Sequence, residues 1–365
     1  MSIYAIGFVA TFLATLLLVL SENWHGHFSM DGTDGVQKHH AHPTPRIGGV
    51  AVMLGLLAVW ALAAPEVQAI LGPMLLASIP AFAAGLLEDV TKKVGVMPRL
   101  LATMLSGAFA WYLTGVAMRN TAVAPLDWLL AFTPIAVLFT AFAVGGVANA
   151  INIIDGFNGL ASGSMVIMLA AIGFIALSVG DAPAAIVCFA VAAVALGFGA
   201  MNWPLGKIFL GDGGAYLLGF LLAWMAVLLP MRNAQLTAWT TMLVCAYPVL
   251  EVAFSVQRRR GRKDQRPGHP DRAHLHHFLH RRLVCKLFPN HSAALQNGLT
   301  SPFCWLYTAL PAGWAMVFAQ NTAMLALGFC VAIFTYATIY ARLTQFRWCL
   351  PLFERKVAVA TVNVA

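Results

Sequence analysis

Long apolar stretches separated by short polar segments run through the chain, and this pattern predicts membrane-spanning helices. Crossing the hydrocarbon core takes about eighteen or more consecutive apolar residues. In lipid the backbone polar groups must be satisfied within the segment, so such spans must be helical. We therefore expect an all-α polytopic helix bundle with eleven spans, near residues 3–20, 47–64, 69–87, 98–118, 126–147, 161–179, 182–201, 211–229, 237–257, 301–319 and 322–341.

The composition favours a membrane protein over a soluble one. Hydrophobic residues make up 60% of the 365 residues, only 10% are charged, and the mean hydropathy is +0.78. A soluble domain carries roughly a quarter charged residues. The six cysteines fall in predicted spans or on one side of the membrane, with no C-x-x-C pair. We interpret them as small hydrophobic side chains and not as a disulfide framework.

The basic residues lie mostly on one side of the predicted bundle. If the N-terminus is outside, Arg119 and Arg232 lie in outside loops, and the rest of the 22 Lys and Arg residues lie on the opposite face. This asymmetry predicts that the basic face is cytoplasmic, with the C-terminus on that side. The net charge of +8 suits anionic headgroups or a phosphate-bearing substrate. We do not expect nucleic acid as a partner, because no soluble module with interleaved aromatic residues accompanies the basic residues.

Polar residues gather in the predicted cytoplasmic segments. The outside loops are short, whereas all 11 histidines and most carboxylates lie inside. We expect one integral membrane domain over residues 1–341 and a cytoplasmic tail at 342–365. The active face of this domain is predicted to comprise the loops 21–46, 88–97, 148–160, 202–210 and 258–300.

Two adjacent carboxylates, Glu88 and Asp89, end the third predicted span in the stretch GLLEDVTKK (85–93). A solvated helix end would explain the two lysines that follow. Ionisable groups at membrane depth are costly and tend to mark function. Paired carboxylates can hold a divalent cation, or one of them can act as a base beside it.

A polar residue recurs every third position in NAINIIDGFNGLASG (149–163). In an α-helix, Asn149, Asn152 and Asp155 would spread over only about 120° and face one interior direction. Interhelical hydrogen bonding is an alternative explanation, and it suffices for Asn149. It does not account for Asp155, because a carboxylate costs far more to bury without a partner.

Glycines surround Asp212 in KIFLGDGGAYLLGF (207–220), where a span begins. Capping of the helix N-terminus is one interpretation of this carboxylate. Glycines also let a phosphate or a metal approach the backbone closely. The segment lacks GxxxxGK[ST] and is therefore not a Walker loop.

The stretches RPGHPDRAHLHHFLHRRL (266–283) and DGVQKHHAHPTPRIGGV (34–50) hold most of the histidines. In the first, arginines around His274, His276 and His277 favour a pyrophosphate-binding cluster. A zinc site is the weaker interpretation, since HExxH is absent and no cysteine pair is near. In the second, Lys38, His40 and Arg46 precede a Gly-Gly helix start, where an ordinary positive flank is the alternative.

These five stretches, in this order, resemble the polyprenyl-phosphate N-acetylhexosamine-1-phosphate transferases of glycosyltransferase family 4. The family's motifs are K-x-H…P-x-x-GG, matched from Lys38 to Gly49; G-[LI]-[LI]-D-D, matched from Gly85 to Asp89; N-x-x-N-x-x-D-G-x-[DN]-G-L, matched from Asn149 to Leu160; G-D-x-G-[SA], matched from Gly211 to Ala215; and P-D-R-x-H-[LI]-H-H, matched from Pro270 to His277. The usual Asp-Asp pair is Glu88-Asp89 here. The last motif is similar to that of the branch that acts on UDP-GlcNAc and related UDP-sugars.

The resemblance implies an Mg²⁺-dependent enzyme of the bacterial inner membrane, with Mn²⁺ able to substitute. It implies transfer of a sugar 1-phosphate, most simply GlcNAc-1-phosphate, from a UDP-sugar to undecaprenyl phosphate, with release of UMP, as a first membrane step of O-antigen or other cell-envelope polysaccharide synthesis. A homodimer stays open. The implied site residues are Glu88, Asp89 and Asp155 as catalytic groups; Lys38, His40, Asn149, Asn152, Asn158, Arg272, His274, His276 and His277 as substrate-binding groups; and Asp212 and Asp89 as metal ligands.

Two other classes of protein fit parts of the sequence. A transporter or flippase for a lipid-linked or anionic solute would also have many spans and basic loops. Transporter sites tend to lie near the bilayer midplane, however, and the predicted midplane is almost free of charge. Glu251, towards the inside end of the ninth span, is the buried carboxylate outside the motifs. A histidine-rich metal sensor is the second alternative.

Overall fold

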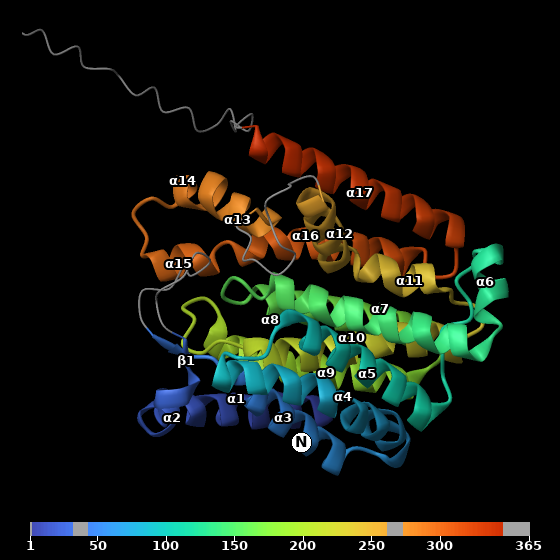
Figure 1. Ribbon diagram of the computed structural model, residues 1–365, viewed down its shortest axis with the longest axis horizontal. Helices are drawn as coiled ribbons and strands as arrows, with labels where there is room; N and C mark the ends of the chain where they lie inside the picture. The colour runs from blue at the N-terminus through green and yellow to red at the C-terminus, as the bar shows by residue number, and fades with distance from the viewer. Residues whose placement is uncertain (1, 32–42, 261–272, 346–365) are drawn as a thin grey trace, which may run out of the picture.

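The computed structural model describes residues 2–31, 43–260 and 273–345. Within these ranges the chain is almost entirely helical (Figure 1), as the apolar pattern predicts. The strand pairing in the described part is a short antiparallel ladder of β1 (Met30–Asp31) with β2 (Thr44–Pro45), in which Met30 is opposite Pro45. The fold class predicted from the sequence, an all-α bundle, is therefore confirmed.

Helices occupy all of the predicted span ranges. The long ones are α1 (Ile3–Leu20), α3 (Gly48–Leu62), α4 (Pro65–Thr91), α5 (Val96–Thr114), α7 (Thr133–Ile154), α8 (Leu160–Ser178), α9 (Ala182–Asn202), α10 (Gly211–Arg232), α16 (Ser301–Val317) and α17 (Thr322–Thr344). The others are α2 (Glu22–Ser29), α6 (Ala124–Leu130), α11 (Ala238–Val244), α12 (Ala246–Arg260), α13 (Leu275–Leu279), the π-helical turn η1 (His280–Val284), α14 (Cys285–Leu287) and α15 (Ala293–Gly298). Among the described residues, 7 helices are long and apolar enough to cross a membrane, or 8 if the bent pair α11–α12 counts as one span. The number eleven stays a prediction.

Two of the predicted spans are each divided into two helices. The range 126–147 contains the end of α6 and the start of α7, and the range 237–257 contains α11 and α12, which are bent by 79°. Pro134 and Pro248 lie in the first turns of α7 and α12. Proline lacks a backbone N–H and its ring clashes with the carbonyl four residues earlier, so each helix begins anew at the proline.

The helix α10 forms the centre of the bundle (Figure 1), and nearly all its side chains are buried. It packs against α4 and α7 and also contacts α3. Outer helices expose large apolar side chains, including Leu17 of α1, Tyr112 of α5 and Phe334 of α17. Exposed apolar surface on this scale marks a contact with lipid or another apolar partner, which fits a multi-pass membrane protein.

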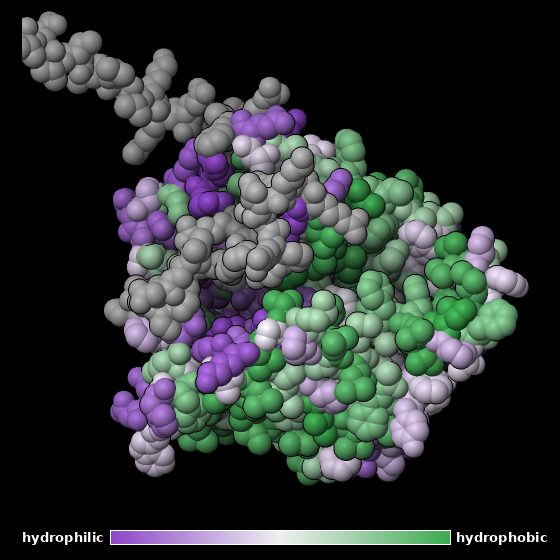
Figure 2. All heavy atoms as spheres, viewed as in Figure 1, coloured by the Kyte–Doolittle hydropathy of each residue, from purple (hydrophilic) through white to green (hydrophobic). Residues whose placement is uncertain are grey.

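One end of the bundle is polar. Figure 2 shows hydrophilic residues gathered at the end where Figure 1 places α2, β1 and α13–α15, whereas hydrophobic residues cover much of the side of the bundle. The helix α6 lies at the opposite end. The segments that the sequence predicts to face the cytoplasm thus meet at one end, although their orientation to a membrane stays a prediction.

Candidate functional site

Glycine residues allow the helices α3, α4 and α10 to come into close contact at the polar end of the bundle. A Cβ added to Gly85 of α4 would lie 2.5 Å from the backbone nitrogen of Gly213 and 2.6 Å from the carbonyl oxygen of Asp212. A Cβ added to Gly49 of α3 would overlap the backbone of Gly214. Glycine is therefore required for α3 and α4 to approach the N-terminus of α10 this closely.

Backbone hydrogen bonds fix the segment before α3 along the segment before α10. The N–H of Gly48 donates to the carbonyl of Phe209 (3.0 Å), and the N–H of Phe209 donates to the carbonyl of Pro45 (2.8 Å). Arg46 lies between these two bonds in the sequence. Its side chain is thereby directed to the N-terminus of α10.

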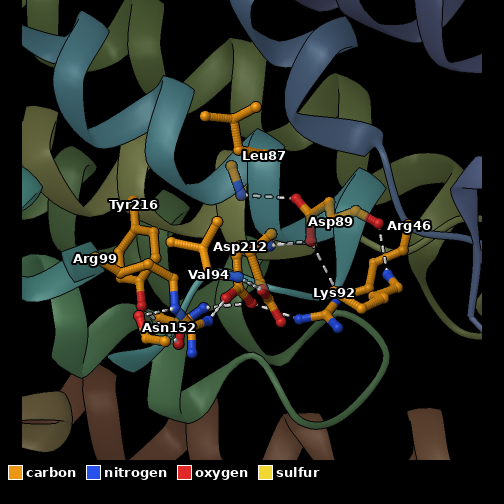
Figure 3. Close-up of polar contacts among 12 residues, drawn as sticks. Arg46, Leu87, Asp89, Lys92, Val94, Arg99, Asn152, Asp212 and Tyr216 are labelled. Atoms are coloured by element: carbon orange, nitrogen blue, oxygen red, sulfur yellow. Dashed lines mark hydrogen bonds and ion pairs between the residues drawn. The ribbon is translucent and has the colours of Figure 1, made fainter. Parts of the chain in front are cut away.

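The buried carboxylate of Asp89 lies at the N-terminus of α10 (Figure 3). It accepts the backbone N–H groups of Asp212 (2.9 Å) and Gly213 (2.8 Å), and Nε of Arg46 lies 3.3 Å from its Oδ1. The unpaired N–H groups and dipole at a helix N-terminus stabilise an anion. Asp89 therefore joins the end of α4 to the beginning of α10.

The side chain of Asp212 is surrounded by donors. Its Oδ1 accepts from Nη2 of Arg46 and from Nδ2 of Asn152 (3.0 Å), and its Oδ2 pairs with Nη1 of Arg99. The hydroxyl of Tyr216 donates to Oδ1 of Asn152 at 3.4 Å. Four helices or their flanks thus converge on one carboxylate (Figure 3), and two guanidinium groups neutralise it.

Glu88 and Lys92 are engaged in the turn after α4. Oε2 of Glu88 accepts the N–H of Val94 (2.7 Å), and Nζ of Lys92 donates to the carbonyl of Asp89 (2.6 Å). Burial and the positive charge of Arg46 lower the pKa of Lys92 below its usual range. Glu88 therefore lies beside the site but contacts the turn after α4, whereas Asp89 contacts the N-terminus of α10.

Asp155 follows the last residue of α7 and is half-buried. Burial raises the pKa of its carboxyl to about 8; the charge of Arg46 acts in the opposite direction, and that of Asp89 adds to the rise. The backbone N–H of Asp155 donates to the carbonyl of Asn152 (3.2 Å), and Asn152 donates to Asp212, so Asp155 lies close to the Asp89–Asp212 junction. Its side chain forms no hydrogen bond or ion pair with the described residues.

The histidine segment packs against the turn after Asp155. The ring of Phe157 lies 5.5 Å from that of His276, 5.5 Å from that of His277 and 5.1 Å from that of His280, centroid to centroid. A Cβ added to Gly156 would lie 3.4 Å from Nε2 of His276. Side chains that are more than a hundred residues apart in the sequence therefore pack together, and Phe157, His276 and His277 are buried in this contact.

Comparison with known proteins shows a family to which this chain is similar. Residues 71–230 match the model of glycosyl transferase family 4.

Curated relatives align with between 42% and 90% of the chain. An undecaprenyl-phosphate alpha-N-acetylglucosaminyl 1-phosphate transferase of Yersinia pestis is 26% identical over 341 residues, which are 90% of this chain and 88% of the relative. The protein of the same name from Escherichia coli (strain K12) is 35% identical over 162 residues, 42% of this chain and 43% of the relative. A probable undecaprenyl-phosphate N-acetylglucosaminyl 1-phosphate transferase of Bacillus subtilis (strain 168) is 29% identical over 244 residues, 67% of each chain.

The structure brings some of the predicted site residues together. Asp89, Asn152, Asp155 and Asp212 converge at the start of α10, with Glu88 beside them. His274, His276 and His277 lie in the adjoining segment. The predicted residues Lys38, His40 and Arg272 lie outside the described residues. The functional roles of all these residues stay predictions.

Two of the predicted substrate-binding amides are used in packing. Nδ2 of Asn149 donates to Oγ1 of Thr103 (3.1 Å) and to the carbonyl of Gly145 (2.8 Å), between α5 and α7. Nδ2 of Asn158 donates to the carbonyl of Pro204 (3.1 Å). Their contacts stabilise the turns and helices that present Asn152 and Asp155.

Three residues of the site, Arg46, Arg99 and Tyr216, are absent from the set predicted from the sequence. Arg99 lies in the first turn of α5, where a cation is unfavourable next to the positive end of the helix dipole. This unfavourable position of Arg99 indicates that a negatively charged group elsewhere in the fold compensates its positive charge. Arg46 lies within the matched P-x-x-GG segment, where it is grouped with Lys38 and His40 from the sequence but is not among the implied site residues.

The carboxylates of this junction suit a magnesium ion that is completed by a substrate. No group of three or more His, Cys, Asp and Glu side chains in the described ranges is arranged to hold a metal ion. Mg²⁺ commonly binds through one or two carboxylates together with waters and substrate phosphates. The oxygens of Asp212 and the nearby Asp155 fit that pattern, whereas both oxygens of Asp89 accept backbone N–H groups.

Proposed function

We propose that this chain transfers N-acetylglucosamine 1-phosphate from UDP-GlcNAc to undecaprenyl phosphate and releases UMP. The names of its relatives support this reaction. The observation that carries the proposal is the convergence of Arg46 and Arg99 on Asp212 beside Asp89, at the polar end of an apolar bundle. Such a site can bind an anionic water-soluble donor next to a lipid-borne phosphate.

The reaction is a phosphoryl transfer between two anions. An oxygen of the lipid phosphate forms a bond to the sugar-bearing phosphorus of the donor, and the bond from that phosphorus to the UMP oxygen breaks. Catalysis of this kind depends mainly on positioning and on neutralisation of charge. We assign Arg46 and Arg99 to the donor diphosphate, because a guanidinium group binds phosphate oxygens with two parallel hydrogen bonds.

We assign the metal to Asp212, with Asp89 as the neighbouring carboxylate. Mg²⁺, when bound there, would supply positive charge to the donor phosphates, and Mn²⁺ would substitute because it also prefers oxygen ligands. Asp89 holds the α10 N-terminus against α4 and so sets the direction in which Asp212 points. Asp155 and the segment His274–His277 would line the nucleotide-sugar site, and Asn158, through its contact with Pro204, would support the turn that presents Asp155.

Glu88 would orient the lipid phosphate. A phosphomonoester has a second pKa near 6, so the acceptor is largely ionised at neutral pH. A strong general base is therefore unnecessary, and positioning of the acceptor is the main requirement. The longer side chain of Glu88, compared with aspartate, keeps the negative charge that this role needs.

The site would face the cytoplasm in the inner membrane of a bacterium. The placement of Arg119 and Arg232 at the opposite side from nearly all other basic residues supports that orientation. The product would enter O-antigen or another cell-envelope polysaccharide.

A turnover assay with the purified full-length protein tests the proposal. The protein should release UMP and form a lipid-linked sugar from UDP-GlcNAc and undecaprenyl phosphate, and only when Mg²⁺ or Mn²⁺ is present. UDP-GalNAc and other UDP-N-acetylhexosamines should be compared under the same conditions. Uptake of a lipid-linked or anionic solute into vesicles with no UMP release would instead favour a transporter.

A further inference from the structure

Glu251 is a completely buried acid that the proposed reaction does not use. It lies in α12, its side chain is 0% exposed, and it is not part of the Asp89–Asp212 junction. Burying a carboxylate is costly unless hydrogen bonds or an opposite charge compensate for it. The partners of Glu251 therefore indicate what the residue is retained for.

Those partners are the first residues of the histidine segment. Oε1 of Glu251 lies 2.8 Å from Nδ1 of His274. The N–H of Leu275 donates to both carboxylate oxygens, at 3.2 Å each. An ionised carboxylate only accepts hydrogen bonds. When Glu251 is in that form, Nδ1–H of His274 donates to it, and Glu251 sets the orientation of the ring.

The orientation of His274 is passed on to its neighbours by ring contacts. The rings of His274 and His276 are stacked, with centroids 5.3 Å apart and planes 13° apart. The ring of His276 lies 4.5 Å from that of His277 and packs on the turn at Gly156 and Phe157, next to Asp155. A continuous path of contacts therefore leads from Glu251 to the turn that bears Asp155.

The backbone of the segment has a separate anchor. The hydroxyl of Tyr340, on α17, donates to the carbonyl of Ala273 (2.9 Å) and accepts from Nη1 of Arg258 (3.0 Å). The chain just before His274 is thus held by α17 as well as by α12. A change that removes only the charge of Glu251 should leave the segment in place and alter the ring of His274.

We propose that Glu251 is a positioning residue for the sugar-phosphate transfer: by fixing the protonated nitrogen and the ring plane of His274, it sets the face that His274, His276 and His277 present to the donor. This inference rests on the proposed function. In this role Glu251 differs from a residue that only anchors the segment. Such a residue would act through the Leu275 N–H and would affect folding alone.

The variant Glu251→Gln separates these two roles. Glutamine has the same size and its oxygen still accepts from Leu275, but it lacks the charge that selects the Nδ1-protonated ring. Outer partners that orient a ligating histidine typically contribute 10- to 100-fold, and we expect kcat/KM for UDP-GlcNAc to fall by about that factor. KM for undecaprenyl phosphate and the melting temperature should stay close to the wild-type values.

A double-mutant cycle with His274→Gln tests whether Glu251 acts through His274. In the His274→Gln background, Glu251→Gln should cost less than about twofold, because contacting residues are strongly coupled. Asp181→Asn is the matched control: Asp181 pairs with Arg232, 2.7 Å away, apart from the histidine segment. Its effect should be the same in both backgrounds. An equal loss from Glu251→Gln in both backgrounds would overturn the proposal.

A spectroscopic measurement tests the inference without relying on turnover. In the full-length protein with ¹⁵N-labelled histidine, the His274 signal, assigned by its loss in His274→Gln, should report a protonated Nδ1 and should change in Glu251→Gln. An unprotonated Nδ1, or a signal unaffected by Glu251→Gln, would contradict the inference. If these signals behave as expected but no UDP-sugar yields UMP, the positioning of His274 stands and the proposed function fails.

Discussion

The carboxylate of Asp89 accepts the backbone N–H of Asp212, 2.9 Å away, and so binds the last turn of α4 to the first turn of α10. The motif at the end of α4 therefore determines the direction in which Asp212, the acid of the motif that begins α10, points. Arg46 pairs with both carboxylates and joins the segment before α3 to the same place. Motifs far apart in the sequence become one site because each supplies a partner for the next.

Asp212→Asn should abolish divalent-metal-dependent UMP release. Loss of a metal ligand removes several kcal/mol of transition-state stabilisation, which corresponds to a rate loss on the order of a hundredfold or more. UMP release by the purified variant measures this, with size-exclusion chromatography to show that the fold is intact. Asp181→Asn, the same chemical change at another ion pair, should retain its metal-dependent turnover. Near-wild-type turnover of Asp212→Asn would show that the metal assignment is wrong.

Glu88→Gln should reduce turnover more than donor binding. The glutamine oxygen can still accept the N–H of Val94, so the substitution removes the charge and preserves the turn. We expect kcat to fall by about a hundredfold or less, at the low end of general acid–base effects, because the acceptor is already ionised. Steady-state kinetics and donor titration separate the two quantities. A collapse of UDP-GlcNAc affinity with high residual turnover would contradict the acceptor-side role.

Arg99→Gln should have opposite effects on metal and donor. Arg99 pairs with Asp212 in the structure, so its loss should strengthen the apparent affinity for Mg²⁺. The same loss should raise KM for UDP-GlcNAc on the order of tenfold, since a hydrogen bond to a charged group contributes about 1.5–3 kcal/mol. Arg119→Gln is the control, because Arg119 donates to the carbonyl of Ala131 beside α6. Weakening of both affinities in Arg99→Gln would refute a competition for Asp212.

The stability of the protein should decrease as Asp155 loses its proton. Burial raises the pKa of this carboxyl from 3.8 to about 8. Between these values the folded protein holds a proton that the unfolded chain has released, so the free energy of unfolding falls as pH rises. Melting temperatures from pH 5 to 8 should therefore decline more steeply for the wild type than for Asp155→Asn. Parallel curves for the two proteins would contradict the raised pKa.

The sequence predicts the helical fold for a physical reason, and it singles out acids that the structure brings near one another, although their roles stay predictions. Apolar length determines whether a segment spans lipid, and an acid such as Asp155 is too costly to bury without a function. The breaks near Pro134 and Pro248 could not be predicted from proline alone, because α4 continues through Pro73 and Pro80. The expected spans accordingly run through both prolines.

Which side chains contact one another could not be predicted from the sequence. Arg46 and Asp212 are 166 positions apart, and only the packing of α3, α4 and α10 brings them together. Asn149 and Asn152 look alike in the sequence, and three residues of helix place their side chains only about 60° apart and about 4.5 Å apart along the helix axis. Asn149 consequently contacts α5, while Asn152 reaches Asp212 of α10.

The most direct test of the proposed reaction follows the sugar-bearing phosphate. UDP-GlcNAc labelled with ³²P in that phosphate is incubated with the purified protein, undecaprenyl phosphate and Mg²⁺, and the lipid and nucleotide products are separated. The account predicts that the label enters the lipid in amounts equal to the UMP released, and that the UMP carries none of it. Label that remains in a released nucleotide, or UMP formed without labelled lipid, would contradict a transfer of sugar 1-phosphate.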